Sequence, residues 1–221
     1  MKTGIEYLKT LLENPVESDK ADYKSAIEFK EDTDFSTKLV KHILGFANSG
    51  GGYIVIGFHE PNADKKLSID PNFSEAIISS YEVTRLCQLV NSILGNQDRI
   101  DLTIAKIDHA GKTFPIISIA PFKRRPFFCK RTRELKNKEV CLKEGAIYIR
   151  VPGAQTVEVA GAGDWDRLIS QCVEAEYETF LKRAKDVLSE GFSFEKINLE
   201  KNSDVLVELK SVQEKFWDKI K

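Results

Sequence analysis

Residues 45–58 read Gly-Phe-Ala-Asn-Ser-Gly-Gly-Gly-Tyr-Ile-Val-Ile-Gly-Phe and are the most informative segment of the chain. Apolar residues recur at helical spacing up to Ala47, which predicts an amphipathic helix over roughly 35–48. The apolar run at 52–58 predicts a strand that is central in a sheet and covered on both faces. The glycines between them suit two interpretations. They could form a helix C-cap with a tight turn, or let the backbone approach a phosphate or another strand.

The order of these elements argues against a P-loop. A P-loop needs Gly-Lys-Ser/Thr leading into a helix, so that the helix N-terminus points at the phosphates. Here Gly50-Gly51-Gly52 is followed by Tyr53 and a predicted strand. We therefore expect no ATP hydrolysis and no ATP cofactor.

Outside this segment, helices and strands follow one another in a non-repeating order. Periodicity and turn signals predict helices at 4–13, 82–95, 165–189 and 203–220. They predict strands at 21–29, 100–108, 113–121, 126–130 and 146–151, and a loop at 59–75. This pattern indicates an α+β fold, with a mixed sheet, flanking helices and additional C-terminal helices.

Composition excludes some classes of protein. The chain has 221 residues, of which 42% are apolar, and its four cysteines form no CxxC pair. We expect reduced thiols rather than disulfides or a zinc site. No apolar run is long enough to cross a bilayer, and the N-terminus lacks the apolar core of a signal peptide. A cytoplasmic location with no membrane partner is therefore expected.

The net charge of −1 hides a strongly basic segment between Lys123 and Arg150. Its ten basic residues stand against three acids, which makes the segment +7. The basic residues are Lys123, Arg124, Arg125, Lys130, Arg131, Arg133, Lys136, Lys138, Lys143 and Arg150. Such a concentration is typical either of a polyanion-binding surface or of a solvated loop. The interleaved Phe127 and Phe128 could stack on unpaired bases or anchor the loop to the core.

Three carboxylates are the candidate metal ligands. Glu17 and Asp22 flank the start of one predicted strand, and Glu60 follows the predicted central strand. If those strands are neighbours, the carboxylates could converge and hold Mg²⁺ or Mn²⁺. They could equally be solvated turn residues. Lys24 lies on the same strand face as Asp22, where it could either stabilise charge on a phosphate or pair with one of the acids.

The ordered set of these motifs resembles the AlbA-like domain of the Schlafen family. It comprises Glu17-Ser18, then Asp22-Tyr23-Lys24, a helix, Phe46-Ala47-Asn48-Ser49 with the glycines, and the strand ending at Glu60. Arg125-Pro126-Phe127 and the segment 145–151 are similar to the family's second half. The resemblance covers roughly residues 15–155.

The resemblance implies nucleic-acid binding. In some members of this family, an acidic triplet at matching positions is the catalytic set of a metal-dependent endoribonuclease that acts on structured RNA such as tRNA. It thus implies catalytic roles for Glu17, Asp22, Glu60 and Lys24, and favours RNA over DNA. The alternative is a non-catalytic DNA- or RNA-binding module of a regulatory or defence system.

We expect two parts, an AlbA-like domain at 1–160 and a helical extension at 161–221. The apolar stripes of the extension must be covered by the domain itself, by a second copy of the chain or by a partner protein.

Overall fold

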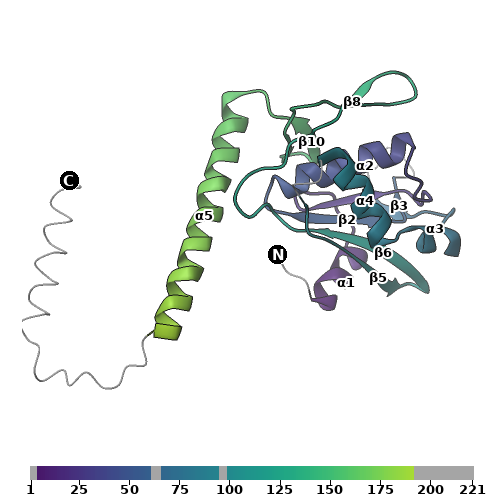
Figure 1. Cartoon of the computed structure of the whole chain (residues 1–221). Helices are drawn as coiled ribbons and strands as arrows, with labels where there is room; N and C mark the ends of the chain where they lie inside the picture. Colours follow the sequence, from purple (N-terminus) through teal and green to yellow (C-terminus); the bar gives the residue numbers. More distant parts are fainter. Residues whose placement is uncertain (1–3, 61–65, 95–98, 192–221) are drawn as a thin grey trace, which may run out of the picture. The chain divides into compact units, whose positions relative to one another are not determined.

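The computed structural model describes residues 4–60, 66–94 and 99–191, and the side chains as far as residue 186 (Figure 1). The chain divides into two compact units, residues 1–177 and 178–221. The first unit holds the sheet and all the sites discussed below. The predicted helix at 203–220 lies outside the described residues.

The first unit is built on a four-stranded sheet. Its strands are β1 (Ala21–Lys24), β2 (Gly52–Ile56), β6 (Lys112–Ile119) and β5 (Leu102–His109), in that order across the sheet. β1 and β2 run parallel, whereas β2–β6 and β6–β5 are antiparallel. A parallel pair needs a crossover connection, which α2 (Asp34–Ala47) supplies. The expected α+β fold with a mixed sheet is confirmed.

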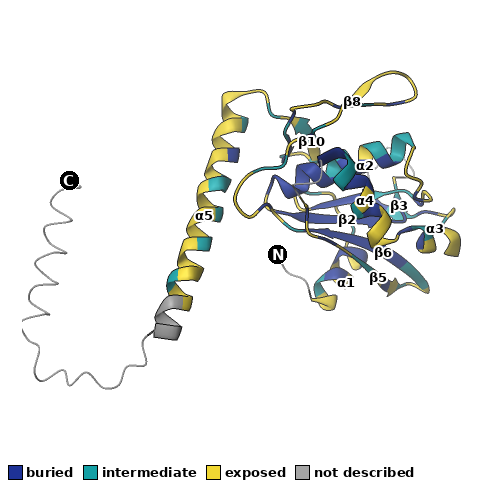
Figure 2. Cartoon of the chain, in the orientation of Figure 1, coloured by how far each residue is buried: buried dark blue, intermediate teal, exposed yellow. Residues whose placement is uncertain are grey.

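Both faces of β2 are covered. Ile54 and Ile56 belong to the core cluster formed with α2 and α4 (Val83–Leu94). The alternate residues Tyr53 and Val55 belong to the cluster formed with α1 (Ile5–Glu13). All five residues of β2 are buried, as Figure 2 shows in dark blue. This alternation confirms the prediction of a central strand buried on both faces.

The remaining elements are short, apart from the last helix. β3 (Phe58–His59) pairs with β4 (Ser68–Ile69), β7 (Arg133–Glu134) with β8 (Val140–Leu142), and β9 (Tyr148–Val151) with β10 (Gln155–Glu158). The other two are helices, α3 (Glu75–Ser80) and α5 (Ala162–Gly191). β4 lies within the predicted loop at 59–75, which was therefore wrong in part.

Two strand predictions were also wrong. The strand expected at 21–29 ends at Lys24, because the next backbone amides find side-chain acceptors. The Ala26 amide donates to Asp70 Oδ2 (2.9 Å) and the Phe29 amide to Ser80 Oγ (2.9 Å). No strand forms at 126–130, where the Phe127 amide donates to the side chain of Asn48 (2.7 Å). In both places, a side chain from a distant part of the chain replaces a sheet ladder.

The turn between α2 and β2 explains the glycine run. Gly50 and Gly51 have φ of 79° and 76°, the left-handed region that favours glycine. At Gly52, a Cβ atom would overlap the ring of Phe46 and lie 2.9 Å from the Lys20 carbonyl oxygen. The glycines therefore reverse the chain and let the end of α2 approach β2 closely.

The first part of α5 belongs to the sheet-containing unit. Leu168 is buried with Phe122 and Ile149, and Cys172 and Ala175 pack against them. The helix therefore begins close to the expected boundary at 160/161, but its residues up to 177 form part of the first unit. Among the described residues, no helix is long and apolar enough to span a membrane.

Substituting Gly52→Ala should lower the free energy of unfolding by about 1–3 kcal/mol, because the added methyl group has no space beside Phe46. Urea denaturation monitored by circular dichroism measures the change. Gly163→Ala in α5 is the matched control, since no neighbouring atom lies within 4 Å of the place that its new methyl group would occupy, and it should be neutral or slightly stabilising. Equal destabilisation by both changes would contradict this account of the turn.

Candidate functional site

Asp22 is the centre of a buried ionic cluster. Its residue exposure is 2%, and its Oδ2 lies 2.6 Å from Lys24 Nζ. Its Oδ1 accepts a hydrogen bond from Arg150 Nη2 at 3.3 Å. Of the two roles expected for Lys24, the structure shows the ion pair with an acid. One buried carboxylate is thus held by two cations.

Arg150 does not lie on the exposed basic surface where the sequence placed it. Its side chain is 0% exposed and its guanidinium lies over the Phe46 ring, 4.5 Å from the ring centre. Besides Asp22, the guanidinium donates to the carbonyl oxygen of Ser18 (3.1 Å) and to Thr156 Oγ1 (3.3 Å). Pairing of β9 with β10 and the need of Asp22 for counter-charge account for this position.

His42 completes this cluster from α2. Its Nδ1 lies 3.2 Å from Arg150 Nη1 and 3.2 Å from Thr156 Oγ1. Burial, together with the charge of Lys24, lowers the pKa of His42 to about 4. The imidazole is therefore neutral near pH 7, so Nδ1 can accept the hydrogen bond from the guanidinium.

Glu17 and Glu60 come together in an acidic groove of about 870 Å³. The groove runs between the end of α1 and the residues after β3, and its other charged lining residues are Glu13 and Lys66. Burial raises the pKa of Glu17, and the negative charges of Asp22 and Glu60 raise it further, against the opposing effect of Lys24. The structure therefore brings Glu17 and Glu60 to one groove, with Asp22 close enough to affect Glu17 electrostatically.

The expected three-carboxylate metal site does not fit this arrangement. Within the described ranges, no group of three or more His, Cys, Asp and Glu side chains could hold a metal ion. The reason is that Asp22 is buried and already neutralised by Lys24 and Arg150. Two carboxylates suffice for Mg²⁺ when water and substrate oxygens complete the shell, so Glu17 and Glu60 are the residues that would fit.

The first half of the basic segment is strongly exposed. The side chains of Lys123 and Arg124 are 80% and 69% exposed, and they form ion pairs with Asp101 (2.8 Å) and Glu176 (2.9 Å). Such exposed pairs contribute about 0–1 kcal/mol, so they do not prevent contact with phosphates. The other exposed or half-buried cations of the segment are Arg125, Lys130, Arg131, Arg133, Lys136, Lys138 and Lys143.

Asn48 anchors this segment to the core. Its buried amide donates to the carbonyl oxygens of Phe127 (2.7 Å) and Tyr148 (3.0 Å), and accepts from the Phe127 amide (2.7 Å). Next to it, Ser49 Oγ accepts from the Arg150 amide (2.8 Å). The local sequence pattern did not predict these contacts. The missed signal is two polar residues at the end of an otherwise apolar helix face.

The two phenylalanines of the segment divide the roles that the sequence left open. Phe127 is half-buried and packs against the core, so it anchors the segment. Phe128 is 40% exposed, and Lys130 Nζ lies 5.4 Å from its ring centre. An exposed ring beside a cation is the arrangement that stacks on an unpaired base.

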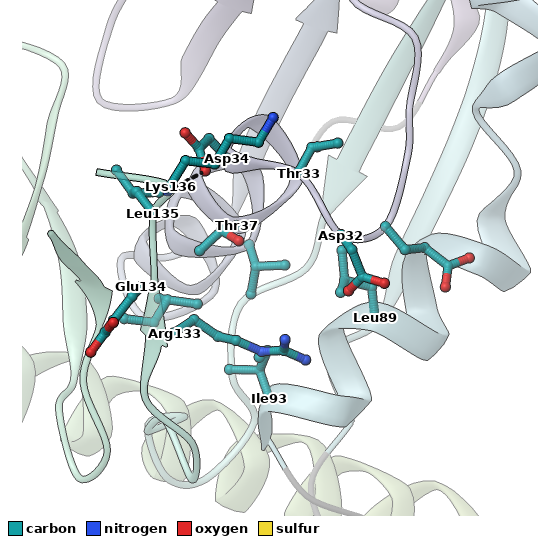
Figure 3. A pocket seen from close by; sticks show the side chains of 13 residues that line it. Asp32, Thr33, Asp34, Thr37, Leu89, Ile93, Arg133, Glu134, Leu135 and Lys136 are labelled. Carbon is teal, nitrogen blue, oxygen red and sulfur yellow. Dashed lines mark hydrogen bonds between the residues drawn. The ribbon is translucent and has the colours of Figure 1, made fainter. Parts of the chain in front are cut away.

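Arg133 lies in a different environment from the exposed cations. It lines a cavity of about 210 Å³ between the start of α2 and α4, and Figure 3 shows its side chain extending toward Ile93. The lining also contains four acids, Glu31, Asp32, Asp34 and Glu134. Two residues of the lining are joined by a hydrogen bond, in which the Lys136 amide donates to Asp34 Oδ1 (2.9 Å). Arg133 thus shares the lining of this cavity with four acids.

The glycine turn presents oxygen atoms to a cation. Lys20 Nζ donates to the carbonyl oxygen of Ser49 (2.7 Å), and the carbonyl oxygen of Gly51 is 3.5 Å away. The Gly51 amide donates a hydrogen bond to the Phe46 carbonyl oxygen (2.8 Å). These contacts support the turn interpretation of residues 48–52 rather than phosphate binding by the turn itself.

Asp22→Asn should lower the free energy of unfolding by about 3–5 kcal/mol, because it leaves Lys24 and Arg150 without their shared counter-charge. Chemical denaturation at neutral pH measures the loss. The exposed neighbour Asp19 provides the control, since Asp19→Asn should change stability by less than about 0.5 kcal/mol. If Asp22→Asn is as mild as Asp19→Asn, the buried cluster does not hold this part of the fold.

Comparison with solved structures gives two distant likenesses. One is the DIP2311 protein of Corynebacterium diphtheriae, with 16% identity and a TM-score of 0.45 over 73% of this chain and 31% of that one. The other is the N-terminal domain of a Nitrosomonas europaea protein whose name relates it to the ATP-dependent DNA helicase RecG. It has 15% identity and a TM-score of 0.38, and the match covers 73% of this chain and 97% of that domain. The chain thus spans less than a third of the length of DIP2311.

The family comparison is more extensive. No curated protein sequence matches the chain. A family model described as Schlafen, AlbA_2 matches residues 17–159, which include the ionic cluster, the glycine turn and the basic segment. The chain therefore belongs to the Schlafen AlbA_2 family, and is a nucleic-acid-related domain.

Proposed function

We propose that the chain binds nucleic acid through the exposed cations of the basic segment, and that RNA is favoured over DNA. The observation that carries this proposal is the anchoring of the segment. Asn48 holds Phe127 by two hydrogen bonds, so the cations on either side of it project from a defined backbone. The cations proposed to contact phosphates are Lys123, Arg124, Arg125, Lys130 and Arg131.

The side chains of the basic segment suit the binding of single-stranded nucleic acid. Cations spaced along an exposed segment can neutralise successive phosphates, and Phe128 offers a ring face to an unpaired base. Arg150 and Arg133 are left out of this set. Arg150 has a fully buried side chain, and Arg133 extends into an acid-lined cavity.

Binding to a single-stranded RNA oligonucleotide should weaken steeply as salt rises. The slope of log K against log salt is negative, and each lost phosphate contact reduces its magnitude by about 0.7. Lys123→Gln, Arg124→Gln and Arg131→Gln together should therefore reduce the magnitude by about 2. Fluorescence anisotropy over a range of salt concentrations measures the slope, with DNA of equal length as the second ligand.

The matched control removes three cations from α5 instead, by Lys182→Gln, Arg183→Gln and Lys185→Gln. All three side chains are exposed, and the change in net charge is the same. The proposal fails if both triple variants reduce the magnitude of the slope equally, or if binding of the natural sequence is insensitive to salt.

A second candidate is metal-dependent cleavage of RNA in the acidic groove. The observation that favours it is the position of Glu17 and Glu60 in one groove. Burial, and then the negative charges of Asp22 and Glu60, raise the pKa of Glu17, so its carboxylate would gain a favourable partner in a divalent cation. Mg²⁺ or Mn²⁺ would be held by Glu17 and Glu60, and when bound would polarise a phosphate group. Asp22 and Lys24 would support this groove structurally through their ion pair.

Cleavage of tRNA in the presence of Mn²⁺ should fall by about 100-fold or more when Glu17→Gln and Glu60→Gln are combined, and should stop when EDTA is added. Gel electrophoresis of the labelled RNA measures the rate. Glu13→Gln is the control, because Glu13 lines the same groove without belonging to the proposed ligand pair. Intact RNA and DNA under all conditions would leave the chain a non-catalytic binding module.

Two further expectations remain proposals. The helix α5 exposes large apolar side chains that are 45–64% accessible, those of Trp165, Ile169, Val173 and Tyr177. Their exposure favours pairing of this helix with a second copy of the chain or with a partner protein.

All four cysteines are free thiols, and burial raises the pKa of Cys129 to about 12. Unreactive free thiols agree with the proposed cytoplasmic location.

A further inference from the structure

We propose that a second cavity, beside the acidic groove, binds a phosphate monoester. The cavity has a volume of about 460 Å³ and lies where β1, the end of α2, β9 and α5 meet. It shares Ser18 and Gly153 with the acidic groove but has the opposite charge. The polar residues that line it include Lys20, Arg150, Arg167, Ser18, Ser49 and Gln171, of which Arg150 contributes its charge from a fully buried side chain.

Positive charge dominates this cavity. Its lining contains three cationic residues against one acid, Asp19. Arg150 lies beneath the surface and shares its counter-charge Asp22 with Lys24, so the buried cluster holds two cations for one carboxylate. His42 is neutral near pH 7 and adds no charge. In surroundings of low dielectric constant, this excess favours an anion in the adjacent cavity.

Two cations of the lining, Lys20 and Arg167, are accessible to a ligand. The two bonds of Lys20 to the turn carbonyls hold its ammonium group in place. Arg167 is exposed, and it has no ion pair or side-chain hydrogen bond within the part of the chain that the structure describes. In the same described part, two buried polar atoms of lining residues, Arg150 Nε and Gln171 Oε1, have no hydrogen-bond partner. The exposed guanidinium of Arg167 favours a ligand that accepts several hydrogen bonds.

Two hydroxyl groups add to these donors. Ser18 Oγ accepts from the amides of Lys20 (3.2 Å) and Ala21 (3.0 Å), and Ser49 Oγ accepts from the Arg150 amide (2.8 Å). Each hydroxyl still has its own proton to donate. A phosphate group, with three acceptor oxygens, matches a set made of an ammonium, a guanidinium and two hydroxyls.

The neighbouring acidic groove favours a terminal phosphate over a continuous nucleic-acid backbone as the ligand of the cationic cavity. Glu13, Glu17 and Glu60 line that groove and, without a bound divalent cation, would repel a long polyanion that passed through both cavities. A monoester carries more charge than a diester and can occupy the cationic cavity alone. The inference therefore goes beyond nucleic-acid binding by the basic segment, since it concerns a separate site that binds one phosphate group.

Isothermal titration of the full chain with inorganic phosphate, and then with a nucleoside 5′-monophosphate, tests the site. Saturable binding is expected, and Arg167→Gln should weaken it by about tenfold, the effect of one lost charge-assisted hydrogen bond. Arg167→Lys should recover part of the affinity. Arg183→Gln is the matched control on the same helix and should leave binding unchanged. If neither probe binds, or if Arg167→Gln binds as tightly as Arg183→Gln, the inference is overturned.

Two oligonucleotides of one sequence, with a 5′-phosphate or a 5′-hydroxyl, identify the source of the phosphate. If the pocket binds a strand end, the phosphorylated strand should bind about tenfold more tightly, and Arg167→Gln should abolish that advantage. Equal binding of both strands, together with binding of phosphate, assigns the pocket to free phosphate or a mononucleotide. The 5′-hydroxyl strand reports on the basic segment alone, so failure of either proposal can be recognised separately.

Discussion

The hydrogen bonds of the buried Asn48 side chain connect the core of this domain to its basic surface. Its amide joins the end of α2 to Phe127 and to Tyr148 at the start of β9. Leaving a buried donor or acceptor unpaired costs about 1–3 kcal/mol, so the loss of any one of these bonds would destabilise the connection. The glycine turn that follows Asn48 brings α2 against β2 and thereby positions this connection. The basic segment thus depends on the same few residues that form the centre of the fold.

The buried Asp22 organises the other side of the domain. With Lys24 and Arg150 around it, Asp22 behaves as a structural anion rather than an open ligand. Its charge also reaches Glu17, whose pKa is raised. The result is two neighbouring cavities of opposite sign, an acidic groove containing Glu17 and Glu60 and a cationic cavity containing Lys20 and Arg167. The divalent cation and the phosphate proposed above would thus occupy neighbouring cavities.

Most of the central layer could be predicted from local pattern. The strand at β2, the helices α2 and α4, and the β5–β6 hairpin all follow from apolar periodicity and turn signals. The two errors in predicted strands share one cause. At Ala26, Phe29 and Phe127, backbone amides bond to side chains that are 44–79 residues away in the sequence. Such partners are invisible to a local pattern, and they ended one predicted strand and prevented another.

The sequence by itself determined the class of fold, the family resemblance and which charged residues were candidates for binding or catalysis. It could do so because periodicity, glycine positions and motif order are local properties of the chain. Only the tertiary structure decided the use of those residues. It buried Arg150, paired Lys24 with Asp22, and left Glu17 and Glu60 at an open groove. The physical reason is that burial and charge pairing depend on which distant segments meet, so residues of the same type become buried structural ions in one place and exposed side chains in another.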